Sequence, residues 1–424
     1  MCFKTLDEYK QSRFNFWFSH KGSEYVFNTK TGSLIMIERD YLPRATLDEI
    51  KALFDNGILV ERDCDEVSDF EKLTEAAINR KPDSLDITLV LTEACNFNCD
   101  YCFETHNSNR MTETDIDRLA SLVDRLTIDG VKKFRIQYYG GEPLLNSRLI
   151  LRADQIFRSK ERDGELSYDS YITTNGSLFT DDIIKSIQFD TVQLTFDGDQ
   201  YYHDLLKKST SFHYRDLLDL VDRLLSRTSS KIVIRFNVCL ENKESFFTTL
   251  ERIGQLPNFN PSRIRITPQR LKTFPGNRNF TEISPMDYSD VYLRIVLAAK
   301  EIGLHPTLPY ALSTPCKFST GNAVCFGPGL KPYFCSMNYS DSSFNINLNK
   351  HYTLRYPDVC RRCMVLPLCQ NFCALRAAGK DGCIPEKYIL KNLLSDYLDN
   401  PDSWLDQTRI LASRDAVLVA GESE

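Results

Sequence analysis

Residues 85–104, which decide the fold, read LDITLVLTEACNFNCDYCFE. The first half is an apolar run rich in strand-forming residues and predicts a β-strand. The second half brings three cysteines together within eight residues, at spacing C-x3-C-x2-C. In α/β folds the chemistry lies beyond the carboxyl ends of the strands, so the sequence predicts a reactive site in this loop.

Strands alternate with amphipathic helices from residue 85 onward, which predicts right-handed βαβ units around a parallel sheet. The predicted strands are 85–92, 133–139, 169–174, 191–196, 231–238 and 262–268, and the helices lie near 112–127, 147–160, 180–187, 213–227 and 243–254. Six such units fit either a partial barrel or a doubly wound sheet.

The regions on either side of these units differ in character. Before them, runs at 14–19, 24–28 and 33–39 predict a strand meander, followed by a helix at 46–56, a strand at 58–63 and a helix near 66–78. After residue 310 the chain becomes rich in Cys, Gly and Pro, and a helix from Glu386 to Leu398 follows. We therefore expect a small α+β region, large enough to fold alone, a central α/β unit and a cysteine-rich region.

Charge and hydropathy narrow the classes of partner. The 424 residues include 52 Lys and Arg against 58 Asp and Glu, and no long basic block occurs, so nucleic acid is not an expected partner. No apolar run reaches 18 residues and the first residues are charged, so we expect no membrane partner and a cytoplasmic location. Fourteen cysteines in a reducing compartment indicate metal or redox chemistry.

The triad of Cys95, Cys99 and Cys102 is best explained by an iron–sulfur cluster. A zinc site is the alternative, but zinc takes four ligands, usually in two separated pairs, and no His completes the set nearby. Three thiolates on a four-iron four-sulfur cluster leave one iron open to bind a substrate or cofactor. The triad therefore favours catalysis over electron storage.

The sequence here resembles the radical S-adenosylmethionine (SAM) enzymes, because further motifs fall at the ends of later strands in that family's order. The resemblance implies a partial (β/α)6, TIM-like barrel and a SAM site. The implied cofactor-binding residues are Tyr101 beside the triad, Gly140, Gly141 and Glu142 of the GGEP motif, Thr174 and Asn175 after the third strand, and Thr195 in the fourth. No catalytic base is assigned.

One position departs from the family pattern. Lys207 follows His203 and Asp204 where related enzymes often carry Arg in an HDxxR motif. Lysine keeps the charge but loses the bidentate fork, which puts a carboxylate contact there in doubt. Arg235 is the alternative source of a guanidinium, so both residues are predicted to bind cofactor.

The remaining cysteine cluster resembles the SPASM extension of radical SAM enzymes. Its second half has the spacing C-x2-C-x5-C-x3-C and one further Cys. The resemblance implies two auxiliary four-iron clusters, one held by Cys316, Cys325, Cys335 and Cys373 and one by Cys360, Cys363, Cys369 and Cys383, although two structural zinc ions are an alternative. Cys2, Cys64 and Cys239 remain as ordinary thiols.

The resemblance also implies the reaction. Together with the triad cluster, the predicted cofactors are SAM and three four-iron clusters, and the triad cluster reduces SAM to give a 5′-deoxyadenosyl radical. The expected partners are an electron donor such as flavodoxin or ferredoxin, and a ribosomally made precursor peptide with a leader. The favoured product is a side-chain cross-link of the cyclophane C–C or ether type, with a thioether second. A non-catalytic iron–sulfur carrier is a further alternative.

An anaerobic sulfatase maturase is the main competitor. Such enzymes begin almost at the triad, whereas residues 1–84 precede this unit, and Ser336 stands after Cys335 where they have an Asp base. The wording YVFNTKTGSLIMI resembles a winged-helix-like precursor-recognition domain. The predicted domains are recognition at 1–84, a radical SAM core at 85–309, a SPASM domain at 310–390, and a helix and tail at 391–424.

Overall fold

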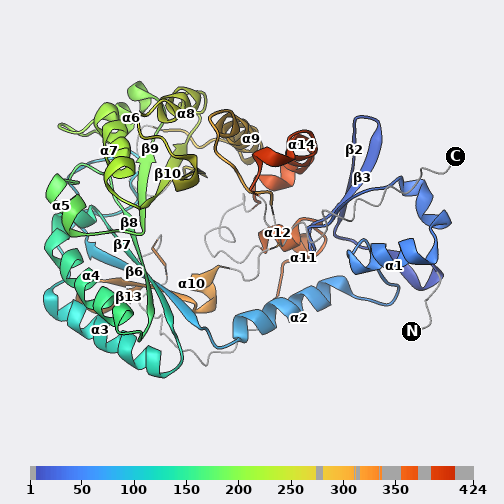
Figure 1. Cartoon of the computed structure of the whole chain (residues 1–424), viewed down its shortest axis with the longest axis horizontal. Coiled ribbons are helices and arrows are strands. Elements are labelled where there is room, and N and C mark those ends of the chain that lie inside the picture. The colour runs from blue at the N-terminus through green and yellow to red at the C-terminus, as the bar shows by residue number, and fades with distance from the viewer. Residues whose placement is uncertain are drawn as a thin grey trace. The chain divides into compact units, whose positions relative to one another are not determined.

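The structure is a computed structural model that describes residues 6–273, 280–309, 311, 316–333, 335–336, 355–370 and 383–405. The chain folds into two compact units (Figure 1). The first comprises Met1–Arg80, Thr307–Cys316 and His351–Glu424, and the second comprises Lys81–Pro306 and Lys317–Lys350. Among the helices that the structure describes, none combines the length and apolar composition needed to cross a bilayer.

The second unit is built on an eight-stranded sheet with strand order β11-β10-β9-β8-β7-β6-β12-β13. Six strands run parallel in chain order, and their bounds are β6 Ser84–Thr92, β7 Lys133–Gly140, β8 Ser167–Thr173, β9 Thr191–Phe196, β10 Lys231–Val238 and β11 Ile264–Arg270. All six predicted strands are therefore present, and the predicted α/β fold with a central parallel sheet is confirmed.

Helices cover one face of this sheet, on the outer side of its curve in Figure 1. They are α3 Glu113–Ile128, α4 Ser147–Arg162, α5 Asp181–Ser186, α6 Gln200–Lys207, α7 Tyr214–Arg227, α8 Phe246–Gly254 and α9 Pro285–Glu301. Alternate strand residues such as Ile136, Leu194 and Ile234 are fully buried in the core on this side. Because successive side chains point to opposite faces of a strand, the residues between them form the other face.

This other face, called the inner face below, is polar. Its side chains form hydrogen bonds between neighbouring strands: Gln137 Nε2 donates to Thr173 Oγ1 at 2.9 Å, and Tyr171 OH donates to Gln193 Oε1 at 2.7 Å. These inner-face residues are only half-buried, unlike their neighbours in the core. The inner face is thus a wall that can receive a polar ligand.

Several elements of this unit were not predicted. Strand β12 (Ala323–Gly327) pairs in parallel with β6, and β13 (Lys331–Tyr333) pairs antiparallel with β12. Both lie in the cysteine-rich region, which we expected to have few regular elements. Helices α6 and α9 were also missed, although Ser284 caps α9 by accepting from Asp287 N and Pro285 occupies its first turn.

The first unit contains a three-stranded antiparallel sheet with order β2-β3-β4 and a separate β1–β5 pair. The bounds are β1 Tyr9–Gln11, β2 Asn15–His20, β3 Ser23–Asn28, β4 Leu34–Met36, β5 Leu59–Glu61, α1 Leu47–Asp55 and α2 Glu66–Asn79. Thr46 and Glu49 form a capping box at the start of α1. Within the three-stranded sheet, β2 and β4 are edge strands.

Residues from both ends of the chain share one core in this unit. Phe14, Val67, Phe70 and Ile78 cluster with Tyr356 and Leu366, and Cys360 packs against them. Glu71 of α2 forms an ion pair with Arg361 of α11 (Asp358–Arg361), which is followed by α12 (Leu366–Cys369) and α14 (Glu386–Asp399). The first 80 residues therefore build part of their core with a distant segment, which no pattern in the sequence indicated. The boundaries between the four predicted domains stay a prediction.

Candidate functional site

The cysteine triad follows directly after β6, in a loop that the GGEP turn holds in place. Gly141 N donates to Thr92 O at 3.0 Å, and Glu142 N donates to Ala94 O at 2.9 Å. A Cβ on Gly141 would lie 2.3 Å from Ala94 O, and one on Gly140, whose φ is +130°, would lie 2.2 Å from Thr92 O. Both glycines are required because two backbones approach too closely for any side chain.

Glu142 lies at the centre of this turn and is fully buried. Its Oε1 accepts from Leu144 N at 3.0 Å and from Thr174 Oγ1 at 2.7 Å, and its Oε2 accepts from Asn175 N at 2.9 Å. Burial raises the pKa of Glu142, while these donors oppose that shift. A carboxylate offers about four acceptor positions, so three bonds leave one for a further donor such as an ammonium group.

The third strand end is joined to the triad loop by side-chain amides. Asn175 Nδ2 donates to Asn96 Oδ1 at 2.9 Å, and Asn96 Nδ2 donates to Ser177 Oγ at 2.8 Å. Asn96 lies inside the C-x3-C spacing, and neither it nor Ser177 was predicted. Only the folded chain shows that these two residues fix the loop, because they are 81 positions apart.

A buried charged group lies beyond the ends of β9 and α6. Tyr101 OH donates to Asp197 Oδ2 at 2.8 Å, Lys207 Nζ lies 3.5 Å from the same oxygen, and Lys207 Nζ is 5.5 Å from the centre of the Tyr101 ring. Burial opposes the charge of Lys207, but Asp197 together with Cys99 and Cys95 outweighs burial and raises the pKa of Lys207. Asp197 Oδ1 is buried and has no hydrogen-bond partner in the described part of the chain. The structure thus brings predicted Tyr101 and Lys207 together.

Helix α6 attaches this group to the triad loop. Asp100 N donates to Leu206 O at 3.0 Å, and Lys208 forms an ion pair with Asp100. Asp100 lies between Cys99 and Cys102, so the C-terminal end of α6 holds the middle of the cysteine loop. Lys207, which stands where related enzymes often have Arg, is the last residue of this short helix.

The remaining predicted residues, Thr195 and Arg235, are paired in register on the inner face. Arg235 Nε donates to Asn237 Oδ1 at 2.8 Å. Asn237 in turn partly offsets the rise in pKa that burial causes at Tyr101 and at Asp197. Arg235 is therefore level with Thr195, which lies two residues before Asp197 in the sequence.

The triad fits an iron–sulfur cluster by the chemistry of its donors. Burial raises the pKa of Cys95 to about 11 and of Cys102 to about 12, and burial also raises the pKa of Cys99. Three thiolates can share this loop only if cationic metal compensates their charge. In the described ranges no group of three His, Cys, Asp or Glu side chains is arranged to hold a single metal ion. A cluster instead takes one thiolate per iron around a cube.

The auxiliary cysteines fall in both units. Cys325 on β12 and Cys335 after β13 are buried in the second unit, and Cys316 belongs to the first. The other four belong to the first unit, where Cys360 and Cys369 act electrostatically on Tyr356, and Cys363 and Cys383 act on Lys387, whose Nζ is 3.3 Å from Cys383 Sγ. Cys373 lies outside the described residues. The assignment of ligands to two clusters stays a prediction.

The fold and the triad loop together define a class of proteins. In this class a loop with three cysteines follows the first strand of a parallel α/β sheet. Residues 89–253 match the Radical SAM superfamily, so this part of the chain is a radical SAM domain. It is 23% identical over 285 residues to the radical SAM cyclopropyl synthase TigE of Paramaledivibacter caminithermalis, over 62% of this chain and 59% of that protein. It is 28% identical over 160 residues to the GTP 3′,8-cyclase of Chlorobaculum tepidum, over 36% and 44%. The chain thus spans about half the length of these relatives.

Solved structures show the same fold at low identity. The enzyme anSMEcpe with bound AdoMet has a TM-score of 0.52 and 14% identity, covering 77% of this chain and 97% of that one. SuiB of Streptococcus suis has a TM-score of 0.51 and 12% identity, covering 88% and 97%. Both similarities concern the fold, and they extend beyond the radical SAM domain.

Proposed function

We propose that the chain is a radical SAM peptide maturase that forms a side-chain cross-link in a ribosomally synthesised precursor, of cyclophane C–C or ether type in preference to a thioether. The observation that supports this most is the open cysteine triad held against the buried Glu142 turn. SuiB has been solved with its precursor peptide SuiA, and anSMEcpe with a Cp18Cys peptide, which supports a peptide as substrate class.

In this proposal the described residues hold SAM on two sides. The free acceptor position of Glu142 receives the ammonium group, and Lys207 attracts the carboxylate. Tyr101 and Asp197 keep Lys207 in place, and Thr174, Asn175 and Thr195 border the nucleoside. When bound, the triad cluster and SAM supply a 5′-deoxyadenosyl radical that removes a hydrogen atom from the peptide. The chain positions both partners and excludes water.

Replacing Glu142 with Gln is expected to weaken SAM binding roughly 10- to 100-fold, as expected for losing one charge-assisted hydrogen bond. In the wild type, backbone N–H groups donate to the Glu142 carboxylate. The substitution also places an amide N–H₂ group against these N–H donors. Equilibrium binding of SAM to the reconstituted enzyme measures the effect.

The matched control is Glu165→Gln, because Glu165 is an exposed carboxylate that only pairs with Lys160 at 3.5 Å. It should leave the SAM affinity unchanged. Equal affinities for Glu142→Gln and the wild type would remove Glu142 from the SAM site.

Cross-linking leaves one electron over. One of the two predicted auxiliary clusters would accept this electron. Coupling two side chains removes two hydrogen atoms from the peptide, of which the deoxyadenosyl radical accounts for one. The second leaves as a proton and an electron. Cys360, Cys363, Cys369 and Cys383 would hold such a cluster with every iron ligated, and it would supply electron transfer without binding substrate.

We further propose that strand β4 binds the leader by adding a strand. Ile37 N bonds to Glu24 O and Asn28 N bonds to Ser33 O, so by antiparallel alternation the backbone groups of Leu34 and Met36 point away from β3. On the opposite edge of the sheet the same reasoning leaves Ser19 of β2 facing outward. Either edge has free backbone donors for a peptide strand.

Replacing Met36 with Pro removes one edge N–H, and is expected to abolish modification of the precursor peptide while 5′-deoxyadenosine still forms from SAM. The assay combines anaerobically reconstituted enzyme, SAM and dithionite, and measures peptide mass and 5′-deoxyadenosine by mass spectrometry. A loss of two mass units marks the wild-type product.

Ser19→Pro is the matched control on the β2 edge and should keep the wild-type product. Loss of product in Ser19→Pro alone would move the leader to β2. If both variants modify the peptide normally, recognition does not use this sheet, and the sulfatase-maturase alternative, supported by the fold similarity to anSMEcpe, gains weight.

A further inference from the structure

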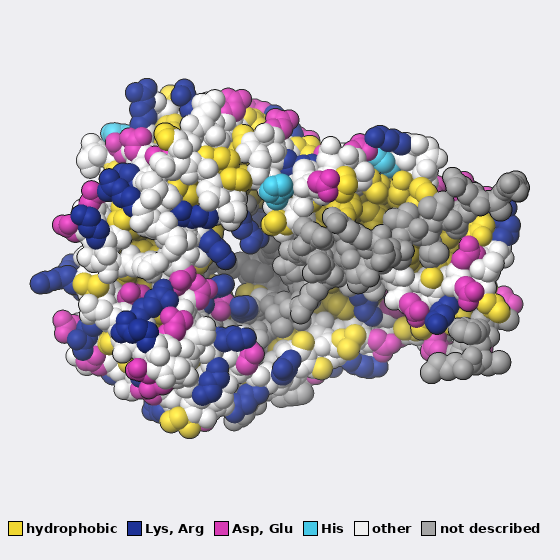
Figure 2. All heavy atoms as spheres, viewed as in Figure 1, with side chains coloured by type: hydrophobic (Ala, Val, Ile, Leu, Met, Phe, Trp, Pro, Cys, Tyr) yellow, Lys and Arg dark blue, Asp and Glu magenta, His cyan; other side chains and the backbone are white. Residues whose placement is uncertain are grey.

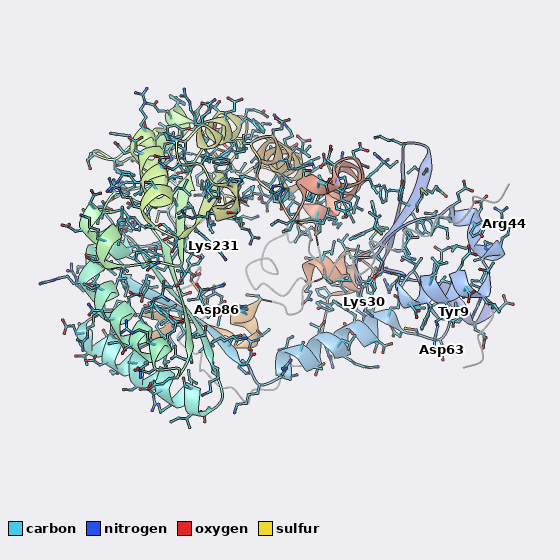
Figure 3. All side chains as sticks on the ribbon, viewed as in Figure 1. Tyr9, Lys30, Arg44, Asp63, Asp86 and Lys231 are labelled. Carbon is cyan, nitrogen blue, oxygen red and sulfur yellow. The ribbon has the colours of Figure 1, made fainter. Side chains whose placement is uncertain are left out.

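The inner face of the sheet carries an excess of cations near the SAM site. Arg135, Arg235 and Arg265 all act electrostatically on Tyr171, which is itself half-buried at the middle of the face. Lys231 begins β10 on the same face, and Figure 3 labels it together with Asp86 of β6. Figure 2 shows dark-blue Lys and Arg side chains over the whole visible face of the molecule, interspersed with magenta Asp and Glu. The charge of the inner face has the opposite sign to the chain's net charge of −6.

Only one of the three arginines is neutralised by a close partner. Arg135 Nε bonds to Asp169 Oδ2 at 2.6 Å, and Asp86, which also pairs with Lys317 at 2.7 Å, lies nearby. By contrast, Arg235 and Arg265 have no carboxylate within ion-pairing distance among the residues that the structure describes. An opposing charge, Glu104, acts electrostatically on Tyr139, as Arg235 also does.

The strand register places the two unpaired arginines close together. Arg265 pairs with Val233, and Arg235 pairs with Thr267, so the two guanidinium groups project from neighbouring strands two residues out of step. With about 3.3 Å per residue and 4.8 Å between strands, their Cα atoms are about 8 Å apart. Two side chains of this length reach one carboxylate between them.

The position of the two arginines relative to the SAM site indicates which molecule carries that carboxylate. Lys207 already lies within the buried Tyr101 and Asp197 group beside the triad, where a SAM carboxylate is expected. Arg235 projects lower on the inner face, level with Thr195, and Arg265 lower still. A ligand held by both arginines therefore lies on the inner face of the sheet. It lies next to SAM and is a separate molecule.

We propose that Arg235 and Arg265 bind a carboxylate of the peptide substrate and so place an acidic peptide segment beside the reacting carbon. The inference rests on the proposed function and names its substrate class: a peptide with Asp, Glu or its own C-terminal carboxylate at this point. The Arg pair determines specificity by charge, and Gln193 and Tyr171 complete a polar wall around it.

The test measures binding to the full-length reconstituted enzyme with SAM and without reductant, so that no turnover occurs. The probes are Ac-Gly-Asp-Gly-NH2, Ac-Gly-Asn-Gly-NH2 and Ac-Gly-Gly-Gly-OH, followed by saturation-transfer NMR. We expect the Asp peptide to bind about tenfold more tightly than the Asn peptide, and Arg265→Gln and Arg235→Gln each to remove that preference. Arg265→Lys should keep part of it, and the exposed Arg252→Gln on α8 should keep all of it.

The outcomes separate the sources and the hypotheses. Preference for Ac-Gly-Gly-Gly-OH over the Asn peptide would assign the site to a C-terminal carboxylate, and preference for the Asp peptide to a side chain. Equal binding of all three, or no saturable binding of any, overturns the proposal. Loss of SAM affinity in Arg235→Gln with peptide binding unchanged also overturns it, by assigning Arg235 to SAM. A wild-type enzyme that binds the Asp peptide but never forms 5′-deoxyadenosine contradicts the proposed function alone.

Discussion

Replacing Cys95, Cys99 and Cys102 together with Ala is expected to abolish formation of 5′-deoxyadenosine from SAM, because the loop then has no thiolate to hold iron. The iron content of anaerobically reconstituted protein should fall from about 12 to about 8 per chain, as expected for losing one of three four-iron clusters. The loop should keep its position, since backbone bonds from Gly141 and Glu142 hold it. Mass spectrometry after dithionite reduction and an iron assay provide the measurements.

The matched control for the triad is Cys64→Ala. Cys64 is a half-buried thiol of the first unit whose Sγ lies 3.4 Å from Asp69 Oδ2, and no cluster is assigned to it. This variant should keep both the iron content and the activity. A triple variant that still forms 5′-deoxyadenosine at the wild-type rate would contradict the site assignment, and colourless protein with stoichiometric zinc would contradict all three clusters.

The second large effect is expected from Cys360→Ala with Cys363→Ala, which should eliminate the modified peptide while 5′-deoxyadenosine continues to form. The two thiols lie at the end of α11, where Cys363 N donates to Cys360 O at 2.9 Å. Removing two of four predicted ligands releases the auxiliary cluster and leaves the triad untouched. The ratio of 5′-deoxyadenosine to modified peptide is the quantity to measure.

Loss of fold must be distinguished from loss of a cluster, because Cys360 also packs against the core formed by Phe14, Phe70 and Tyr356. Arg362→Ala is the matched control, since Arg362 lies between the two cysteines and is not assigned to a cluster. Thermal unfolding monitored by circular dichroism compares both variants with the wild type. Wild-type yields of modified peptide from the double variant would show that this cluster is not needed.

The parallel sheet was predictable because its signal is local. Each of the six strands is an apolar run or alternation, and amphipathic helices follow the first five. The periods of two and 3.6 differ over any ten residues. Helix α6 was missed because it has only eight residues, beginning with the polar sequence QYYHD. Strand β12 was missed because AVCFG is too short to distinguish a strand from a buried helix segment, and its partner β6 lies more than 230 residues away.

The candidate site was predictable where spacing alone reveals chemistry. The triad and GGEP could be found because their members are adjacent in sequence. Asn96 and Ser177 contact each other across 81 positions of sequence, so only the folded chain brings them together at the site. The charge of the inner face was equally hidden, since Arg235 and Arg265 are single residues within ordinary strands.

The shared core of the first unit has a consequence for synthesis on the ribosome. Phe14, Val67 and Phe70 are completed by Tyr356 and Leu366, which are translated almost 290 residues later than Phe70. At 5–20 residues per second this interval lasts about 15 to 60 s. During that time the emerging segment exposes apolar side chains that Tyr356 and Leu366 cover later. Cotranslational binding by a chaperone, and a late step of cluster insertion into the first unit, follow from this order of synthesis.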